Sequence, residues 1–343
     1  MGNAESTKNI GINSNYIKLI RNIYTNASAR MYIDGQTSES FHIGKGVRQG
    51  DPISPKLFTA ALQEVFRNID LCETGIMIDG KELTDLRFAD DIAFIADNIT
   101  SLNDQLNRLH HENKKIGLMI HKGKTQYMSN RTEREAIQID GAIIEKVEEY
   151  KYLGQTLSLN DTINKEVQAR ITAGWRAFGR HKNILLEKEI PMTLKKRVFD
   201  SCILPTISYG SETWPLNNNI CYKLRTAQRA MERSVTKVKR IDKIRAEDIR
   251  ARTKFKDVVE HVQKMKWRWA GHVARMNENR WATRCTDWIP RDRKRPAGRP
   301  LQRWRDDLVK FKGNNWREGC QDRAKWKKFL EGYLQQWSAR PSR

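Results

Sequence analysis

The sequence predicts an α+β fold over residues 1–160, followed by a mostly helical second half. Short alternating or apolar runs separated by Asp-Gly and Gly-rich turns fill the first part, as in an antiparallel sheet with packed helices. After residue 162 the apolar residues recur at helical spacing. Residues 1–160 carry 19 Lys/Arg and 21 Asp/Glu, whereas residues 161–343 carry 44 and 20 and all ten Trp. We therefore expect a globular domain followed by a basic, Trp-rich region.

The basic half indicates a polyanionic partner, because cations beside aromatic side chains suit a phosphate backbone with stacking bases. A membrane is not expected, since no long apolar span or basic amphipathic anchor is present. The five Cys form no CxxC pair, which argues against a zinc site or disulfides and favours an intracellular location, nucleus or cytoplasm. No signal peptide is expected, because the first residues contain no apolar h-region, and the match to the myristoylation pattern at Gly2 is short enough to arise by chance.

The first elements are a helix and two hairpins. The spacing predicts a helix over residues 14–26, capped by Ser14. Its apolar face would comprise Tyr16, Leu19, Ile20 and Ile23. Asp34-Gly35 and Asp79-Gly80 predict hairpin turns within residues 29–43 and 76–83.

A glycine-rich loop lies between these hairpins. Its glycines, from Gly44 to Gly50, would let a ligand approach the backbone around Arg48 and Gln49, although such loops are more often only turns. Ser54 is expected to cap the following helix and Pro55 to occupy its first turn. That helix, running to Ile69, has apolar residues at spacings of three and four, which predicts one core face.

Residues 86–96 carry the acidic doublet Asp90-Asp91 between two apolar runs. Each run is typical of a half-buried strand, so the doublet should lie at a tight hairpin tip together with Phe88 and Ala89. Two carboxylates on a rigid tip repel each other, and a bound Mg²⁺ would remove that repulsion. The doublet therefore indicates half of a two-metal phosphoryl-transfer site, with a polar turn of two solvated Asp as the alternative.

The remaining pattern predicts a helix over residues 99–115 and a strand, basic loop and strand over residues 117–128. Another strand turn is expected over residues 150–157. Beyond it, helical spacing covers residues 163–186, 192–209, 220–237 and 255–276. Residues 289–300 combine three Pro with a dense basic run and are expected to form a linker or arm.

Taken in order, these motifs resemble the reverse transcriptases of non-LTR retrotransposons of the LINE type, closest to the RTE-like group. Residues 48–55 resemble a template- and nucleotide-contacting motif, residues 88–91 a catalytic FADD box, and residues 117–125 the motif that follows it. Residues 150–157 resemble a primer-grip turn, and residues 269–276 with 298–308 resemble the tail found in the same elements. The likeness spans nearly the whole chain.

The resemblance implies a polymerase palm over residues 1–160, a helical thumb over 161–216 and a basic nucleic-acid-binding extension over 217–343. It implies RNA template, DNA primer or target, and dNTP as partners, with two Mg²⁺ as cofactor. It assigns metal binding and catalysis to Asp90 and Asp91, and assistance to the leaving pyrophosphate to Lys124, which could equally be a solvated loop cation. The residues expected to line the template and nucleotide are Arg48, Gln49, Gly50, Phe88 and Ala89.

The resemblance also implies an earlier strand with a third catalytic Asp, which residues 1–13 do not supply, so the fragment is expected to be N-terminally truncated and inactive alone. A non-catalytic nucleic-acid-binding protein and a non-functional retrotransposon relic remain as alternatives.

The basic half has three further features. Asp306-Asp307 repeats the acidic doublet but has a helical pattern, which favours a solvated helix face. Residues 295–300 resemble an AT-hook, although a generic phosphate-binding arm is favoured. The arm residues expected to contact nucleic acid are Arg291, Arg293, Lys294, Arg295 and Arg299. The Trp residues from Trp267 onward are expected mainly in a small core.

Overall fold

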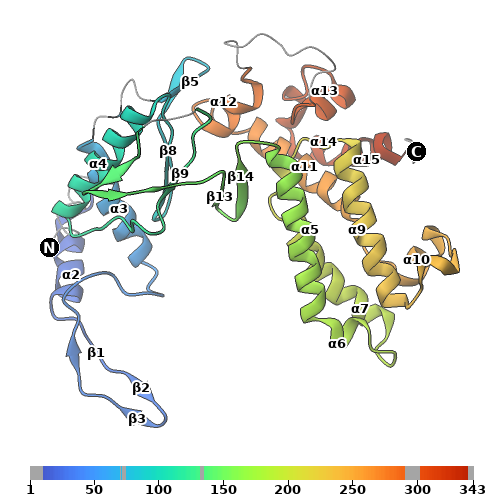
Figure 1. Cartoon of the computed structure of the whole chain (residues 1–343), viewed down its shortest axis with the longest axis horizontal. Coiled ribbons are helices and arrows are strands. Elements are labelled where there is room, and N and C mark those ends of the chain that lie inside the picture. The colour runs from blue at the N-terminus through green and yellow to red at the C-terminus, as the bar shows by residue number, and fades with distance from the viewer. Residues whose placement is uncertain (1–10, 70, 72–74, 132–134, 290–301, 339–343) are drawn as a thin grey trace. The chain divides into compact units, whose positions relative to one another are not determined.

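The computed structural model describes residues 11–69, 71, 75–131, 135–289 and 302–338 (Figure 1). The chain divides into two compact units, residues 1–148 and 149–343. This boundary precedes the hairpin over residues 149–158, which the sequence analysis groups with the first domain. The mixture of helices and short strands confirms an α+β fold. No helix within the described ranges is long and apolar enough to cross a membrane.

The first unit contains three main helices and short strand pairs. It begins with α2 (Ser14–Thr25), β1 (Ser28–Ala29), β2 (Tyr32–Ile33), β3 (Gln36–Thr37) and β4 (Phe41–His42). It continues with α3 (Ser54–Arg67), β5 (Ile76–Ile78), β6 (Lys81–Leu83), β7 (Asp85–Phe88), β8 (Asp91–Phe94) and α4 (Ile99–Lys115). It ends with β9 (Gln126–Tyr127), β10 (Gln138–Ile139), β11 (Ala142–Ile143) and β12 (Glu145–Lys146).

The strands pair two by two and do not form the single antiparallel sheet that the sequence predicts. Among the described residues every sheet has two strands, and β9 pairs with β12 in parallel. The pairs close locally because their turns are favourable. At Asp34-Gly35, Asp79-Gly80 and Asp140-Gly141 both residues have positive φ, as two-residue I′ turns require. The two hairpins predicted from Asp-Gly pairs are therefore confirmed.

Helices α3 and α4 supply the core of the first unit. Leu62, Val65 and Phe66 of α3 pack with Leu109 of α4, and Ile92 and Phe94 of β8 cover this cluster. A second cluster gathers Leu106, Tyr127, Ile137, Ile139 and Ile144. The predicted core face of α3 is thus confirmed.

The predicted details of the first two helices are wrong in three respects. Asn13 caps α2, because its side chain accepts a hydrogen bond from the Asn15 N–H at 2.9 Å, and Ser14 is already helical. The expected apolar face of α2 is largely exposed, with only Ile17 buried. Ser54 does not cap α3, since its hydroxyl lies 3.3 Å from that of Tyr24.

The second unit is mostly helical. It begins with β13 (Glu149–Tyr152), β14 (Gln155–Ser158), α5 (Thr162–Arg180), α6 (Lys182–Leu185) and α7 (Met192–Val198). The π-helical turn η2 (Phe199–Ile203), α8 (Leu204–Ser208), η3 (Ser211–Thr213) and α9 (Asn218–Thr236) follow. Next come η4 (Arg240–Asp242), α10 (Ala246–Thr253), α11 (Val258–Ala274) and α12 (Trp281–Asp287). Last are α13 (Asp306–Lys312), η5 (Glu318–Cys320), α14 (Arg323–Lys328) and α15 (Leu330–Ser338).

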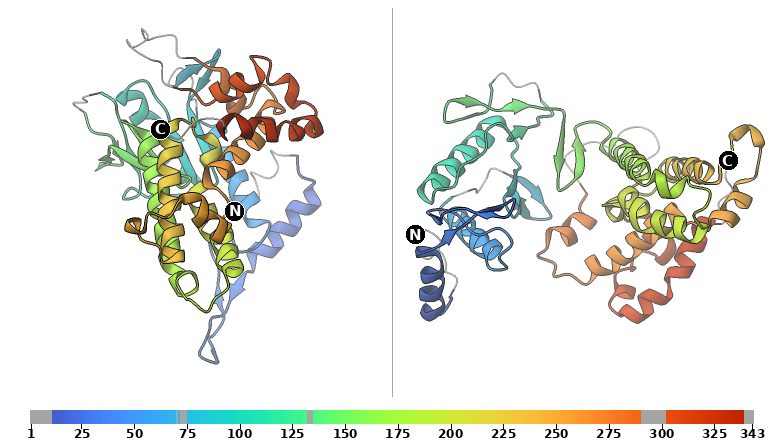
Figure 2. Two further views of the ribbon diagram at one scale, coloured as in Figure 1. Left: turned by 90° about the vertical axis from the view of Figure 1, so that its right-hand side faces the viewer. Right: turned by 90° about the horizontal axis from the view of Figure 1, so that it is seen from below.

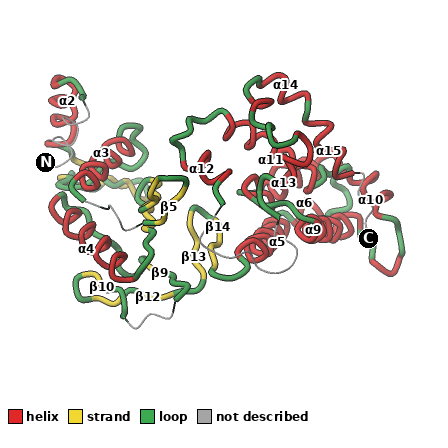
Figure 3. Tube along the Cα trace, turned by 90° about the horizontal axis from the view of Figure 1, so that it is seen from above, coloured by secondary structure: helices red, strands yellow, loops and turns green. Residues whose placement is uncertain are grey.

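Helices α5 and α9 and the continuous helix formed by α7, η2 and α8 lie side by side (Figures 1 and 2). Their large core includes the fully buried Phe199, Leu204 and Trp214. Figure 3 shows how completely helices replace strands after β14. The four helical segments predicted after residue 162 are therefore confirmed with small shifts at their ends.

The Trp residues of the C-terminal part form a second core around α11. The rings of Trp267 and Trp326 stack with centroids 3.6 Å apart, and each indole N–H donates to the carbonyl oxygen of the other residue at 3.0 Å. Gly271 makes this packing possible, because a Cβ at that position would lie 2.6 Å from the Trp326 ring. Trp316 is also buried in this cluster, so the predicted core role is confirmed for these three Trp.

Asp307 is buried, so the solvated helix face expected for Asp306-Asp307 is wrong for its second member. Its Oδ1 lies 2.8 Å from Nζ of the fully buried Lys266, and the Tyr333 hydroxyl donates to its Oδ2 at 2.5 Å. The partners come from α11 and α15, which the local sequence pattern of α13 could not reveal. Breaking such a pair leaves an uncompensated buried charge.

We predict that Asp307→Ala lowers the free energy of unfolding of the second unit by about 3 kcal/mol, because Lys266 loses its ion pair and Tyr333 loses its hydrogen bond to the Asp307 carboxylate. Urea unfolding followed by Trp fluorescence would measure this, since all ten Trp lie after residue 160. The combined Lys266→Met, Asp307→Leu and Tyr333→Phe variant should recover most of the loss. The neighbouring Asp306→Ala is the control and should cost at most about 1 kcal/mol, since Asp306 is exposed. Equal losses from the two single variants would contradict the prediction.

Candidate active site

The acidic doublet lies at the tip of the β7–β8 hairpin. Phe88 pairs with Asp91, and Ala89 and Asp90 form a two-residue turn. Phe88, Ala89, Asp90 and Asp91 are all exposed, so both carboxylates are open to a ligand. The predicted hairpin tip is therefore confirmed as a structural feature.

The turn at this tip is less favourable than the Asp-Gly turns of the same unit. Ala89 has φ +53°, a left-handed conformation that glycine adopts without strain. Turns with positive φ only at the first central position prefer glycine there. The turn thus presents the Asp90 carboxylate although its backbone is strained at Ala89, and such strain is common at functional sites.

Arg87 anchors the hairpin to α3, a role that the sequence analysis missed. Its guanidinium lies over the Phe66 ring, with Cζ 3.5 Å from the centroid, and binds Asp85 at 2.5 Å. The Phe66 and Phe94 rings also lie 6.2 Å apart. Asp85 and Arg87 are two residues apart in β7, so their side chains lie on the same face of the strand. This spacing is the feature of the sequence from which their contact could have been predicted. The anchor fixes the direction in which the tip points.

The glycine-rich loop leads directly into α3. Gly46 and Gly50 have φ +89° and +88°, which explains why these positions need glycine. The Asp51 carboxylate accepts a hydrogen bond from the Ile53 N–H at 3.1 Å and so closes the loop before the helix. Arg48, Gln49 and Gly50 are exposed on this loop.

Lys124 lies in a turn after α4, and the strand predicted before it is absent from the structure. Gly117, at φ +78°, and Leu118 instead terminate α4, because the Leu118 N–H donates to the Asn113 carbonyl at 2.9 Å. Hydrogen bonding and charge from Lys114, with Lys122, hold the pKa of Asp140 below its usual range. Lys124 is exposed and makes no ion pair with another described residue.

The predicted residues of the glycine-rich loop and of the β7–β8 tip lie on elements that pack together within the first unit. The loop with Arg48, Gln49 and Gly50 precedes α3, α3 carries the hairpin with Asp90, and α4 contacts both α3 and β8. Among the described residues no cluster of three or more acidic, His or Cys side chains could hold a metal. The predicted arm residues Arg291, Arg293, Lys294, Arg295 and Arg299 lie outside the described residues, as does Gly2.

The predicted strand turn over residues 150–157 is confirmed as the β13–β14 hairpin of the second unit. Its tip is clamped from α5, since Glu166 accepts from the Thr156 N–H at 2.6 Å and Arg170 donates to the Gly154 carbonyl. The Tyr209 hydroxyl donates to the Leu153 carbonyl at 3.1 Å. A cavity of about 540 Å³ adjoins this tip, lined among others by Tyr152, Gln155, Tyr209, His261 and Met265. Burial, with Lys256 adding to it, lowers the pKa of His261.

Comparison with known proteins identifies the class. Residues 3–157 match the family described as Reverse transcriptase (RNA-dependent DNA polymerase). A transposon-derived protein of Caenorhabditis elegans is 35% identical over 245 residues, which cover 68% of this chain and 86% of that protein. The Pol polyprotein of the type-1 retrotransposable element R2 of Popillia japonica is 27% identical over 43% of this chain. The RNA-directed DNA polymerase of the mobile element jockey of Drosophila melanogaster is 22% identical over 53% of it.

The chain belongs to the reverse transcriptases of non-LTR retrotransposons. It is a reverse transcriptase domain of a transposon, as the resemblance in the sequence indicated. The matched regions span 86% of the nematode protein but only 26% of the R2 polyprotein and 20% of the jockey polymerase.

We predict that Ala89→Gly stabilises the acidic hairpin by up to about 1 kcal/mol, because glycine removes the strain at φ +53°. Native-state hydrogen exchange of the amides in β7 and β8 would report this locally. Gly80→Ala is the reverse control and should destabilise the β5–β6 hairpin, because Gly80 has φ +72°. Slower exchange in the Gly80→Ala hairpin, or faster exchange in the Ala89→Gly hairpin, would argue against strain at these turns.

Proposed function

We propose that the chain is a nucleotidyl-transferring module that copies an RNA template onto a DNA primer, with the first unit acting as palm. The thumb would begin at α5, and the later basic helices would form a nucleic-acid-binding extension. An intracellular location, nucleus or cytoplasm, fits this activity. The single observation that carries the proposal is the β7–β8 tip, which presents two exposed carboxylates within the matched residues 3–157.

The residues at this tip fit a magnesium ion. Mg²⁺ is commonly held by one or two carboxylates together with waters and substrate phosphates, and Asp90 and Asp91 provide two such groups without a competing ion pair among the described residues. Magnesium would supply charge neutralisation of the transferring phosphoryl group. Arg87 would act as a positioning residue, because its contact with Phe66 keeps the carboxylates aimed outward.

The other predicted residues would bind and orient the substrates. Arg48, Gln49 and Gly50 would contact the template and incoming dNTP, with the exposed Phe88 and Ala89 beside the metal ligands. Lys124, as an unpaired cation among the described residues, would neutralise the leaving pyrophosphate. The clamped β13–β14 tip would hold the primer strand.

A two-carboxylate site supports weaker metal binding than the three-carboxylate site that the resemblance implies. A lost ligand interaction worth several kcal/mol lowers a rate by orders of magnitude. We therefore propose very weak or absent extension by this chain alone. The second candidate function, non-catalytic nucleic-acid binding, is favoured by the excess of 44 Lys/Arg over 20 Asp/Glu in residues 161–343.

We predict that the full chain extends a DNA primer on an RNA template at most weakly with Mg²⁺, and that Asp90→Asn abolishes whatever extension remains. Single-turnover primer extension resolved on a gel would measure both. Asp97→Asn is the matched control, because Asp97 is exposed just after β8 and outside the tip. Extension unaffected by Asp90→Asn would refute the proposed site. Robust extension lost only in Asp90→Asn would support the site and refute the proposed weakness.

We predict that replacing Arg291, Arg293, Lys294 and Arg295 together by Ala flattens the salt dependence of RNA binding. The slope of log affinity against log salt should become less negative by about 0.7 for each lost phosphate contact on a single strand. Fluorescence anisotropy at several salt concentrations tests this. Separate fragments 1–148 and 149–343 provide the comparison, and equal affinity of the two would show that the charge of the second unit is only solvated surface.

A further inference from the structure

A second basic surface lies at the end of α9. Residues 237–256, here called the basic projection, contain nine Lys/Arg and three Asp/Glu. They comprise η4, α10 and the turns around them. In Figures 1 and 3 this segment lies at the periphery of the second unit, beyond the C-terminal end of α9.

Most cations of the basic projection face water. The exposed ones are Lys237, Lys239, Arg240, Lys243, Arg245, Arg252, Lys254 and Lys256. None of their side chains forms an ion pair with a carboxylate of another described residue. Ile241, between Arg240 and Asp242, is 81% exposed and adds an apolar contact surface. The charges are therefore not part of the internal ion-pair network of the fold.

The opposite side of the basic projection is firmly packed. Ile249 and Thr253 of α10 are buried, and the Phe255 ring stacks on Phe199 with centroids 4.3 Å apart and an interplanar angle of 12°. This packing holds α10 against α7 and α9. The exposed cations consequently sit on an ordered support.

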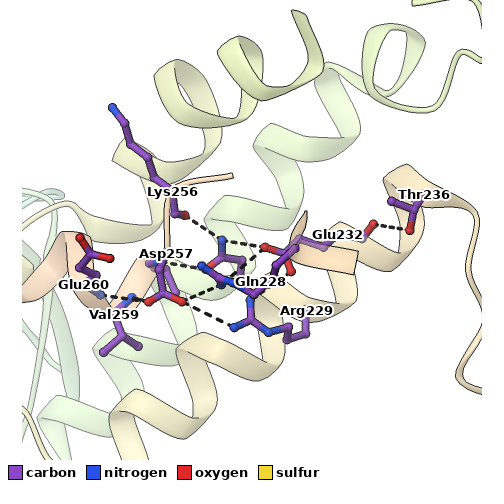
Figure 4. Close-up of polar contacts among 10 residues, drawn as sticks. Gln228, Arg229, Glu232, Thr236, Lys256, Asp257, Val259 and Glu260 are labelled. Carbon is purple, nitrogen blue, oxygen red and sulfur yellow. Dashed lines mark hydrogen bonds and ion pairs between the residues drawn. The ribbon is translucent and has the colours of Figure 1, made fainter. Parts of the chain in front are cut away.

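A buried polar network fixes the same side (Figure 4). Gln228 donates to the Lys256 carbonyl at 2.8 Å and accepts from the Val258 N–H at 2.8 Å. Arg250 binds Asp257 at 2.7 Å, and Asp257 in turn caps α11. Arg250 is thus used structurally, whereas the exposed cations are free for a ligand, and a surface ordered in advance binds with less entropy loss.

Three of the exposed lysines have a left-handed backbone conformation that glycine would adopt without strain. Lys237, Lys243 and Lys254 are the C-caps of α9, η4 and α10 and have φ of +57°, +50° and +52°. Left-handed C-caps favour glycine, although a cation there interacts well with the helix dipole. Glycine at these positions would retain the fold and remove only the charge.

We infer that the basic projection is a binding site for the phosphate backbone of single-stranded nucleic acid, distinct from the acidic tip and from the arm at residues 291–299. Its charge excess and the exposed cations on an ordered support suit contacts to several phosphates, and Ile241 offers a contact to a base or sugar. The choice of nucleic acid over an acidic protein rests on the proposed function. The surface itself stands on its own geometry.

The test compares two variants of the full chain, each of which loses three positive charges at different positions. The projection variant is Lys237→Gly, Lys243→Gly and Lys254→Gly, and the control variant is Lys18→Gln, Arg21→Gln and Arg30→Gln, at exposed positions of the first unit that carry no proposed binding role. Binding of a labelled oligouridine is followed by anisotropy over a salt series. We expect the projection variant to have a slope less negative by about 2 and, at 0.1 M salt, roughly 100-fold weaker binding, as three lost phosphate contacts imply. The control should change far less.

Each other outcome overturns the inference. Equal losses in the two variants would show a general effect of net charge, and no loss would show that the projection is not used. Polyglutamate that displaces oligouridine equally well per charge would indicate an acidic protein partner. Urea unfolding should show unchanged or higher stability for the projection variant, which excludes misfolding as the cause. Asp90→Asn should bind oligouridine normally, so a failure of this site and a failure of the polymerase site are distinguishable.

Discussion

The contact between the Arg87 guanidinium and the Phe66 ring joins the two parts of the candidate active site. Phe66 belongs to α3, which follows the glycine-rich loop, and Arg87 belongs to β7, which leads to the acidic tip. The residues at the tip do not themselves stabilise the hairpin, because the backbone of Ala89 is strained and the carboxylates of Asp90 and Asp91 repel each other. The strands of the hairpin supply stabilising contacts: Ile92 and Phe94 cover the helical core, and Asp85 forms an ion pair with Arg87. The candidate site therefore combines a strained, charged hairpin tip with strands that pack well against α3.

Local signals in the sequence were sufficient where the structure is local. Asp-Gly turns close at Asp34 and Asp79 as expected, and the helical spacing after residue 162 corresponds to real helices. The errors occur where partners are distant. Ser54 could not be known to face Tyr24, and Asp307 could not be known to meet Lys266 and Tyr333, because those residues are 30, 41 and 26 positions away. The exposed hairpin tip was predictable, whereas its Arg87 anchor required the packing of strand on helix.

The second unit separates its aromatic and its charged residues. Trp267, Trp316 and Trp326 are buried together, while the described lysines and arginines of this unit, apart from Lys195 and Lys266, are at least partly exposed. Among the charges that do enter the interior, Lys266 and Glu232 are met by opposite charges. Burial raises the pKa of Glu232 although Arg229 and Arg250 oppose it, which shows how costly interior charge is even with two cations nearby.

The reciprocal pairing of Trp267 and Trp326 also has a consequence for synthesis on the ribosome. The two residues are 59 positions apart, and each satisfies the indole N–H of the other. When α11 leaves the ribosome, its stacking partner has not yet been translated, and at about 5–20 residues per second it follows roughly 3–12 s later. During that interval the nascent chain exposes a large indole surface, and for the first part of it Lys266 still lacks Asp307, which is 41 positions away. Completion of this core is thus delayed until α14 has been translated and Trp326 can stack on Trp267.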